Sequence, residues 1–303
     1  MSEEVKTIYL CLAHMSEEGY EQKYVKEAFD TNWVVPMGPN VYTFEQNLAD
    51  FSNANLDGSK LDRKVVCLSA GTAAVHLALI ACGVQLGDEV CVQSFTFCAS
   101  SHPITYLGAK PVFIDSEKET WNMDPELLEK AIIDRKEKTG KYPKAIIPVA
   151  LYGMPYDCER IMVIADKYGI PVIEDAAEGM GSRYNGQVLG TFGRFGVLSF
   201  NGNKMITTSG GGALICRSDE DANNIMWHAT QARDAYPYYQ HTEIGYNYRM
   251  SNVCAGIGRG QMTVLDAHIA HHKHVQELYE ELLADVPRIH LHKQPSEGNR
   301  KWS

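Results

Sequence analysis

Three short segments of the sequence combine residue types that could do chemistry. The first spans residues 68–79 and reads Leu-Ser-Ala-Gly-Thr-Ala-Ala-Val-His-Leu-Ala-Leu, an apolar run that ends in small residues before helix formers begin. Backbone N–H groups at a helix start, with the Thr72 hydroxyl beside them, would form a site suited to a phosphate group. A tight structural turn capped by Thr72 would explain the same residues.

The second segment places a carboxylate at the end of an apolar run. Residues 172–178 read Val-Ile-Glu-Asp-Ala-Ala-Glu, so Asp175 follows a strand-like stretch directly. At that position a carboxylate can pair with a protonated pyridine nitrogen and keep the ring electron-withdrawing. The alternative is that Asp175 only caps the following turn.

The third segment carries a lysine in a small polar loop. Lys204 lies 29 residues after Asp175, between two apolar runs, and the loop around it is rich in Gly, Asn, Ser and Thr. Hydroxyl and amide groups flank it at Ser199, Asn203, Thr207 and Thr208. A lysine in a loop is usually a solvated charge, but a free lysine amine can also form a Schiff base with an aldehyde cofactor.

Together the three segments meet the demands of one cofactor. A phosphate cradle, an acid for a ring nitrogen and a loop lysine follow one another at the ends of predicted strands, where ligands gather in α/β proteins. We therefore predict that pyridoxal 5'-phosphate (PLP) is the cofactor and that Lys204 holds it as a Schiff base.

The same segments resemble the DegT/DnrJ/StrS sugar aminotransferases, a family of fold-type I PLP enzymes. The resemblance extends over essentially the whole chain and implies a wide, mostly parallel sheet flanked by helices. It rests on five ordered motifs, which are Gly71-Thr72 with Ala73-Ala74, Ser94-Phe-Thr-Phe97, Glu174-Asp-Ala-Ala177, Ser199 to Lys204, and Gly245-Tyr-Asn-Tyr-Arg249.

Within that family, residues 14–16, 31–39 and 198–204 are similar to the bacillosamine-type aminotransferases. Those enzymes convert a UDP-linked 4-keto-6-deoxy N-acetylamino sugar to the 4-amino sugar, with L-glutamate as the amino donor. The similarity therefore implies a nucleotide sugar and L-glutamate as substrates.

The family resemblance also implies a role for individual residues. Lys204 would hold the cofactor and then act as general base and acid, while Asp175 would pair with the pyridinium nitrogen and Phe97 would stack on the ring. Asn247 would reach the phosphate from a neighbouring subunit, so the active sites would be shared in a homodimer. The remaining implied cofactor contacts are Gly71, Thr72, Ser199, Asn203 and Glu178, and the implied substrate contacts are Asn32, Trp33, Val34, Val35 and again Asn247.

Two features depart from the family pattern. Glu178 stands where many relatives carry Gln or His beside the phenolic oxygen of the cofactor, and a carboxylate there would repel a phenolate unless it were protonated or otherwise bonded. Relatives also continue well past residue 303. We therefore expect a large PLP-binding domain with an N-terminal arm over residues 1–264, and a connecting helix with an incomplete small domain over residues 265–303.

The elements that would position these residues follow from the hydrophobic pattern. Near-continuous apolar runs are typical of strands buried on both faces of a parallel sheet, and strand–helix alternation predicts an α/β fold. A long helix, with a possible break, is expected from about Ser251 to about Ala284. The predicted strands are 64–68, 89–93, 110–114, 145–150, 171–174, 196–200 and 212–216, and the predicted helices between them are 72–81, 125–135 and 158–168.

Composition narrows the function classes. With a net charge of −10 the chain does not resemble a nucleic-acid-binding protein, and no apolar stretch is long enough to suggest a membrane span. The start of the chain shows no signal-peptide pattern, and the eight scattered cysteines include no C-x-x-C pair. These features predict a cytoplasmic protein with reduced thiols.

Several alternatives remain at this stage. His268, His271 and His272 have helical spacing, but we interpret them as a solvated helix face and expect no metal site. The aromatic stretch Tyr236 to Tyr239 is interpreted as a loop packed on the large domain or at a dimer contact. A sugar dehydratase of the same fold is disfavoured because that branch replaces the lysine with histidine. A truncated, non-catalytic PLP-binding or assembly protein stays open.

Overall fold

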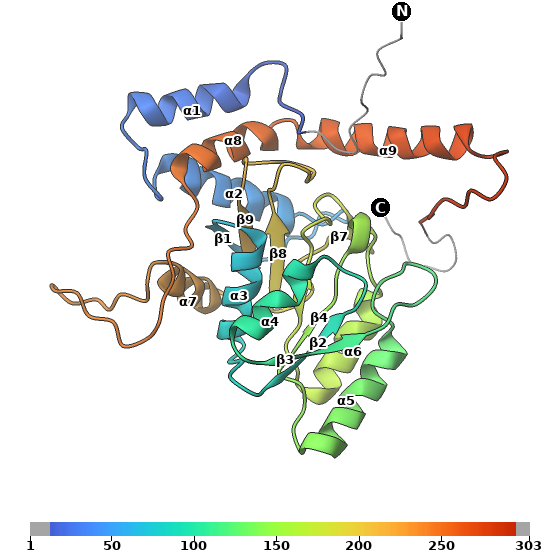
Figure 1. Ribbon diagram of the computed structural model, residues 1–303. Helices are drawn as coiled ribbons and strands as arrows, with labels where there is room; N and C mark the ends of the chain where they lie inside the picture. The colour runs from blue at the N-terminus through green and yellow to red at the C-terminus, as the bar shows by residue number, and fades with distance from the viewer. Residues whose placement is uncertain (1–12, 295–303) are drawn as a thin grey trace, which may run out of the picture.

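Strands form the central layer of the part of the chain that the structure describes (Figure 1). The structure is a computed structural model that describes residues 13–294; the start of the expected N-terminal arm (1–12) and the last part of the expected small domain (295–303) lie outside the described residues. One sheet has the order β1-β9-β8-β5 and a second the order β3-β2-β4. The strands are β1 (Lys64–Leu68), β2 (Glu89–Gln93), β3 (Lys110–Ile114), β4 (Ala145–Ile147), β5 (Ile173–Asp175), β8 (Phe195–Ser199) and β9 (Gly212–Cys216).

The two sheets continue into one another. Parallel bridges pair Ile146 with Val172 and Val149 with Asp175, which places β4 beside β5. The strand order is then β3-β2-β4-β5-β8-β9-β1, and only β9 runs against the others, because it is antiparallel to both β1 and β8. The expectation of a wide, mostly parallel sheet is confirmed.

The predicted strands are all present, with small differences at their ends. β4 stops at Ile147, short of the predicted Ala150, because Pro148 follows and has no N–H to donate to a neighbouring strand. β5 begins two residues later than predicted and includes Asp175. The acid is therefore the last residue of its strand rather than the first residue of a loop.

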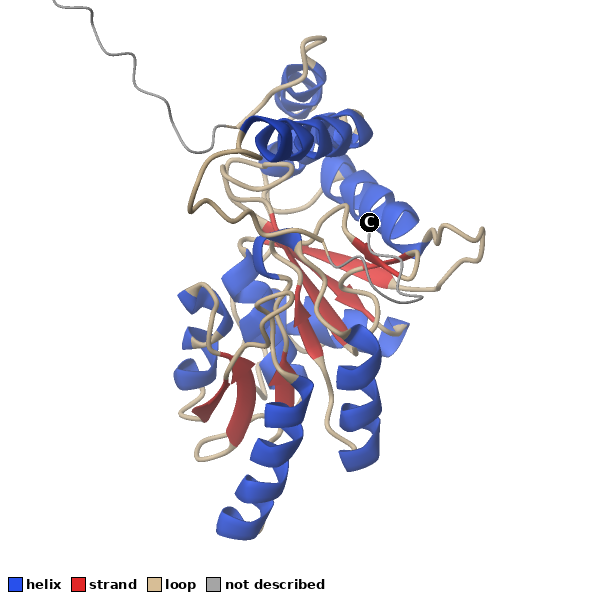
Figure 2. Cartoon of the chain, turned by 90° about the vertical axis from the view of Figure 1, so that its right-hand side faces the viewer, coloured by secondary structure: helices blue, strands red, loops and turns tan. Residues whose placement is uncertain are grey.

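Helices lie on both sides of the strands (Figure 2). The central one, α3 (Gly71–Ala81), is apolar on all sides, and its residues from Ala73 to Leu79 are buried, as expected of a helix enclosed by the core. The other helices are α1 (Tyr20–Asp30), α2 (Pro39–Asn53), α4 (His102–Tyr106), α5 (Pro125–Thr139), α6 (Cys158–Tyr168), α7 (Asp219–Ala229), α8 (Asn252–Met262) and α9 (Leu265–Leu282). Short 3-10 turns at Cys98–Ser100 and Leu151–Gly153 and a small hairpin of β6 (Arg183–Tyr184) and β7 (Gln187–Val188) complete the described elements.

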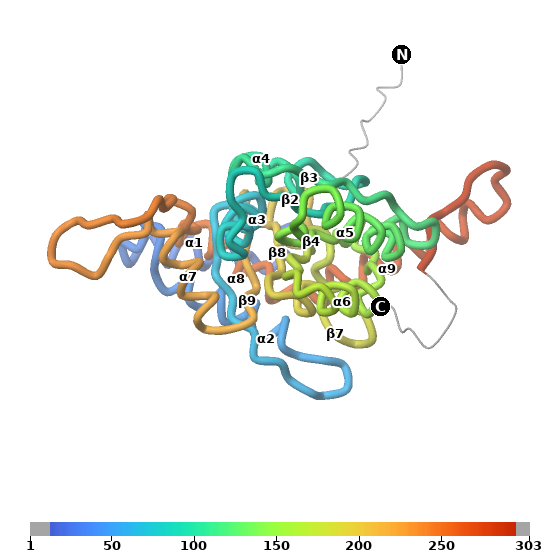
Figure 3. Tube along the Cα trace, turned by 90° about the horizontal axis from the view of Figure 1, so that it is seen from below, coloured from blue at the N-terminus to red at the C-terminus, as the bar shows by residue number. Residues whose placement is uncertain are grey.

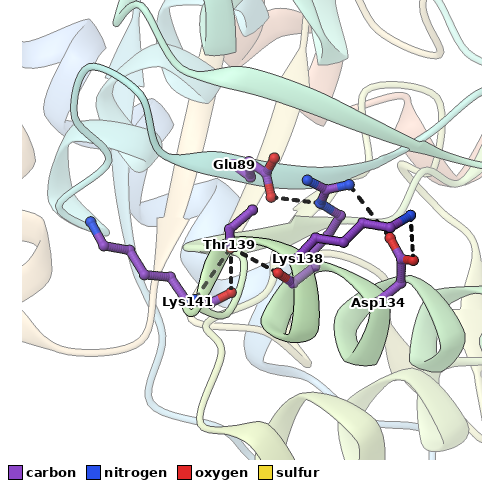
Figure 4. Close-up of polar contacts among 6 residues, drawn as sticks. Glu89, Asp134, Lys138, Thr139 and Lys141 are labelled. Carbon is purple, nitrogen blue, oxygen red and sulfur yellow. Dashed lines mark hydrogen bonds and ion pairs between the residues drawn. The ribbon is translucent and has the colours of Figure 1, made fainter.

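Polar contacts hold the end of α5 on the sheet (Figure 4). Arg135 donates to Glu89 at the start of β2 with an Nε–Oε2 distance of 2.9 Å, and Lys138 pairs with Asp134 one turn away. The helix ends at Thr139 because Gly140 has φ 75°, a left-handed conformation that glycine adopts without strain. This edge of the sheet is opposite to the edge where β5 ends at Asp175 and where Lys204 lies in the loop after β8.

The expected long helix is two helices. α8 and α9 are separated by a break at Thr263 and Val264. α8 packs closely on α1 and α2 because glycines face them: a Cβ at Gly260 would lie 2.5 Å from the Glu21 nitrogen, and one at Gly258 would lie 2.6 Å from the Phe44 ring. Across the described residues, none of the helices combines the length and the apolar character needed to cross a membrane.

Candidate active site

The carboxyl ends of five strands converge on one cavity. Segments following β1, β2, β4, β5 and β8 all contribute to its wall, as expected for ligand sites in open α/β sheets. Its volume is about 480 Å³. The wall includes Gly71, Thr72, Phe97, Asp175, Glu178, Ser199, Asn203 and Lys204, which are eight of the residues singled out in the sequence.

One side of the cavity is shaped to take a phosphate. α3 begins at Gly71, and the residue before it, Ala70, has no side chain that could cap the first N–H groups of the helix. These donors and the positive end of the helix dipole are therefore available to an anion. A Cβ at Gly71 would lie 3.1 Å from the Ser199 Cβ, a tight approach, so glycine leaves space here that a larger residue would fill.

Asp175 occupies the floor of the cavity and is buried. Burial raises the pKa of Asp175, while a hydrogen bond from Ser100 and the backbone N–H of Ala177 favour its ionised form. The Ser100 Oγ lies 2.5 Å from Asp175 Oδ2, and the Ala177 nitrogen lies 3.2 Å from Oδ1. These donors fit a carboxylate that must stay charged in order to pair with a cationic ring nitrogen.

A second hydroxyl supports the first. The Thr96 Oγ1 lies 2.7 Å from the Ser100 Oγ. When Asp175 is ionised, it accepts the single hydroxyl proton of Ser100, and Thr96 is then the donor in its bond with Ser100. Sequence reasoning missed both residues in this role; Thr96 lies inside the Ser94-Phe-Thr-Phe97 motif, but nothing in the sequence indicated that Ser100 approaches Asp175.

Lys204 shares the cavity with Asp175 and is bonded to Glu178. The Lys204 Nζ lies 3.2 Å from Glu178 Oε1, and the backbone N–H of Tyr152 donates to Glu178 Oε2 at 2.7 Å. The unusual acid at position 178 is thus the ion-pair partner of the lysine. Each oxygen of the Glu178 carboxylate therefore accepts from its own donor. The sequence alone did not show what would bond a carboxylate at this position.

Phe97 presents an open aromatic face to the same space. The residue is 75% exposed even though it lines the cavity, so most of its surface is open. An apolar surface of this kind, beside a carboxylate and a lysine, fits a flat heteroaromatic cofactor that stacks on it.

The remaining predicted residues lie outside the cavity. Residues 32–35 are exposed, and their backbone is fixed by Asn252 at the start of α8, which donates to the Trp33 carbonyl at 2.9 Å. Asn247 is exposed, and its backbone pairs with Thr230. Neither segment contributes to the cavity wall of its own chain.

The histidines of α9 have a neighbour that the sequence did not indicate. The ring of His14 lies 6.4 Å from that of His271, and the pKa of His272 is lowered by burial and by the nearby imidazoles. Over residues 13–294, no group of three or more His, Cys, Asp or Glu side chains is arranged to hold a metal ion.

The sheet, the glycine-lined helix start, and the buried acid that faces a lysine define a fold-type I PLP-dependent enzyme. The chain belongs to the DegT/DnrJ/EryC1/StrS aminotransferase family, which its residues 15–303 match, and the aminotransferases of this family use PLP. The resemblance seen in the sequence is therefore confirmed at the level of the family.

Two curated relatives illustrate the match. A putative pyridoxal phosphate-dependent aminotransferase, EpsN of Bacillus subtilis, is 45% identical over 298 residues, which are 98% of this chain and 74% of that protein. A GDP-perosamine synthase of Escherichia coli O157:H7 is 36% identical over 93% of this chain and 73% of its own length.

A solved structure has the same fold. The PLP form of the putative sugar aminotransferase Spr1654 from Streptococcus pneumoniae superposes with a TM-score of 0.81 at 26% sequence identity. The match covers 92% of this chain and 72% of that one.

Proposed function

We propose that this chain transfers the amino group of L-glutamate to the keto carbon of a nucleotide-linked 4-keto-6-deoxy sugar, with a UDP-linked N-acetylamino sugar as the substrate and the 4-amino sugar as the product. The observation that carries the proposal is the single cavity in which Lys204, Asp175, Phe97 and the Gly71 cradle meet. The choice of a UDP sugar rests on the resemblance of residues 14–16, 31–39 and 198–204 to bacillosamine-type enzymes.

The residues present fit PLP, so each can be given a task. Gly71, Thr72 and Ser199 would bind its phosphate, with Asn203 nearby, and Phe97 would stack on its ring. When bound, PLP supplies an electron sink that stabilises negative charge on the carbon beside the substrate nitrogen. Asp175 would keep the ring nitrogen protonated, and the hydroxyl of Ser100, which donates to its carboxylate, favours the ionised form that this pairing needs.

Lys204 would have two tasks. It would first link covalently to the cofactor. Once displaced by the amino group of the substrate, its amine would act as the general base and then the general acid of the 1,3-proton shift. Glu178 would hold this amine in place, because it is the ion-pair partner of Lys204. Tyr152 fixes that carboxylate through its backbone N–H.

A second copy of the chain would complete the site. We propose a homodimer with shared active sites, in which Asn247 reaches the cofactor phosphate of the partner and residues Asn32, Trp33, Val34 and Val35 contact the sugar. The segment 233–244 projects far from the rest of the molecule (Figures 1 and 3) and exposes Tyr236, Tyr238 and Tyr239. Such a contiguous aromatic surface is typical of an interface with another protein surface.

The domain division follows the same proposal. Residues 1–264 would form the PLP-binding domain with its N-terminal arm, and residues 265–303 would form a connecting helix and part of a small domain. α9 buries Leu265 and packs Ile269 against the core, but it exposes apolar side chains such as Tyr279 and Leu282. The exposed apolar side chains of α9 would pack against further structure.

The test is spectroscopic. The purified chain with added PLP should show a yellow absorbance band that excess L-glutamate discharges, and a Lys204→Ala variant should show no such band. A transferred amino group on a UDP-linked 4-keto sugar, detected by mass spectrometry, would complete the proposal. A yellow protein that no amino donor discharges would instead favour the PLP-binding or assembly alternative, and a colourless protein would contradict the assignment of the site.

A further inference from the structure

Three aromatic side chains form a continuous apolar surface at the mouth of the cavity. Phe95 and Tyr152 line the cavity, and Trp121 adjoins Phe95 with 6.3 Å between ring centroids. Phe95 also meets Tyr152 edge-on at 6.4 Å. Their exposed fractions of 46%, 38% and 68% for Phe95, Trp121 and Tyr152 leave much of each ring open. We call this surface the aromatic shelf.

The backbone is strained at two of the three residues. Trp121 has φ 62° and Tyr152 has φ 54°, both in the left-handed region that bulky side chains rarely adopt. Strain of this kind persists only where the surrounding structure enforces it, and it concentrates at ligand-binding sites.

A buried amide pair enforces this arrangement. The Gln93 Nε2 donates to the Phe95 carbonyl at 2.9 Å and lies 3.2 Å from the Asn122 Oδ1. Asn122, which follows Trp121, also accepts from the Leu151 N–H at 3.0 Å, immediately before Tyr152. Both amides are completely buried. One hydrogen-bonded pair therefore fixes the backbone beside all three shelf residues.

The shelf already accepts a flat, nitrogen-containing ring. The imidazole of His292 stacks on Trp121 with 4.0 Å between centroids and 17° between planes. Its Nε2 atom is buried and has no hydrogen-bond partner among residues 13–294, which is an unfavourable state for a polar atom. A ligand ring whose polar groups faced solvent or the cavity could stack on Trp121 in the same place without leaving a buried polar atom unpaired.

We propose that the aromatic shelf binds the base of the nucleotide carried by the sugar substrate. This inference rests on the proposed function, because it assigns the part of that substrate which does not react. The shelf borders the cavity that holds Lys204, so a base on Trp121 would leave the diphosphate and sugar to extend inward. Stacking tolerates any base, and the shelf would therefore supply affinity for a nucleoside diphosphate rather than choose uracil over guanine.

The test uses the PLP-loaded chain and UDP as the probe. Trp121→Leu should weaken UDP binding roughly tenfold or more, the usual effect of removing an aromatic stacking partner. Trp121→Phe should largely keep the affinity but lose the quenching of tryptophan fluorescence that UDP causes in the parent chain. His292→Ala should tighten binding, because it removes the competing ring. Tyr142→Leu is the matched control, since Tyr142 is an exposed aromatic residue outside the shelf.

The outcomes separate the shelf from the proposed function. Discharge of the yellow band by L-glutamate tests the chemistry without UDP, and Trp121→Leu should leave this reaction unchanged. If the band is discharged but UDP binds no more tightly than inorganic pyrophosphate, the shelf does not hold a base. Equal UDP affinity in Trp121→Leu and the parent, or in His292→Ala and the parent, would overturn the proposal in the same way.

Discussion

Replacing Ser100 with alanine tests the link between a buried hydroxyl and the chemistry at the cofactor. Ser100 is 1% exposed and donates to Asp175 at 2.5 Å, while Thr96 donates to Ser100 in turn. Ser100→Ala removes the donor without adding volume. Within the part of the chain that the structure describes, the carboxylate then keeps the Ala177 N–H at 3.2 Å as its one hydrogen bond.

The size of the effect follows from the charge of the acceptor. A hydrogen bond to a charged group contributes roughly 1.5–3 kcal/mol. At about 1.36 kcal/mol per tenfold, its loss should shift the protonation equilibrium of Asp175 towards the neutral acid on the order of 10- to 100-fold, so the L-glutamate half-reaction should slow by up to that factor on the acidic limb of its rate profile. Thr96→Ala should cost less, because Thr96 acts on the carboxylate only through Ser100.

The pH dependence has a definite sign. Burial already raises the pKa of Asp175, and the Ser100 hydrogen bond opposes that shift. Without Ser100 the pKa of Asp175 moves further upward, so the ionised acid is lost at a higher pH. The acidic limb of the rate profile should therefore shift towards higher pH in Ser100→Ala, and raising the pH should recover part of the activity.

The assay is the single-turnover loss of the yellow band with excess L-glutamate, measured across pH. Ser101→Ala is the matched control, because the neighbouring Ser101 hydroxyl donates to the Cys98 carbonyl at 3.3 Å and not to Asp175. A parent-like rate and an unshifted acidic limb in Ser100→Ala would refute the view that this hydroxyl keeps Asp175 ionised. An equal loss in Ser101→Ala would show that the segment, not the hydrogen bond, is responsible.

Three further predictions concern stability. Burial raises the pKa of Glu45 to about 7 from 4.5, so the folded protein should lose up to about 3 kcal/mol as pH rises between these values. Glu45→Gln should remove that loss, so its gain in Tm over the parent should be larger at pH 8 than at pH 5; an equal gain at both would contradict the assignment. Asn122→Ala breaks the buried amide pair and should lower the free energy of unfolding by at least about 2 kcal/mol in urea denaturation, because Gln93 and the Leu151 N–H lose their partner. Phe44→Ala should cost about 3–5 kcal/mol in the same assay, since its fully buried ring packs 5.1 Å from Phe200, whereas Tyr42→Ala, on the same helix but exposed, should cost under 1 kcal/mol.

Much of the large domain could be read from the sequence because its signals are local. Apolar runs at 64–68, 89–93 and 212–216 became strands with those same bounds, since a strand buried on both faces needs a continuous apolar stretch. The run at 110–114 also kept its bounds, as the edge strand β3, of which only Ile114 is buried. The cavity residues could be named for a related reason. Gly71, Asp175 and Ser199 each lie at or beside the end of such a strand or at the start of a helix, and parallel strands bring their carboxyl ends to one edge.

The tertiary structure alone decided which distant side chains meet. Ser100 reaches Asp175 across 75 residues of chain, Gln93 reaches Asn122 across 29, and Glu178 pairs with Lys204 across 26. None of these contacts leaves a periodic pattern, because each depends on how separate strands align rather than on the residues next to it. The sequence by itself determined the cofactor, the strands and the residues at their ends; only the packing of those strands determined how Asp175 is kept charged, what holds Lys204, and where the aromatic shelf stands.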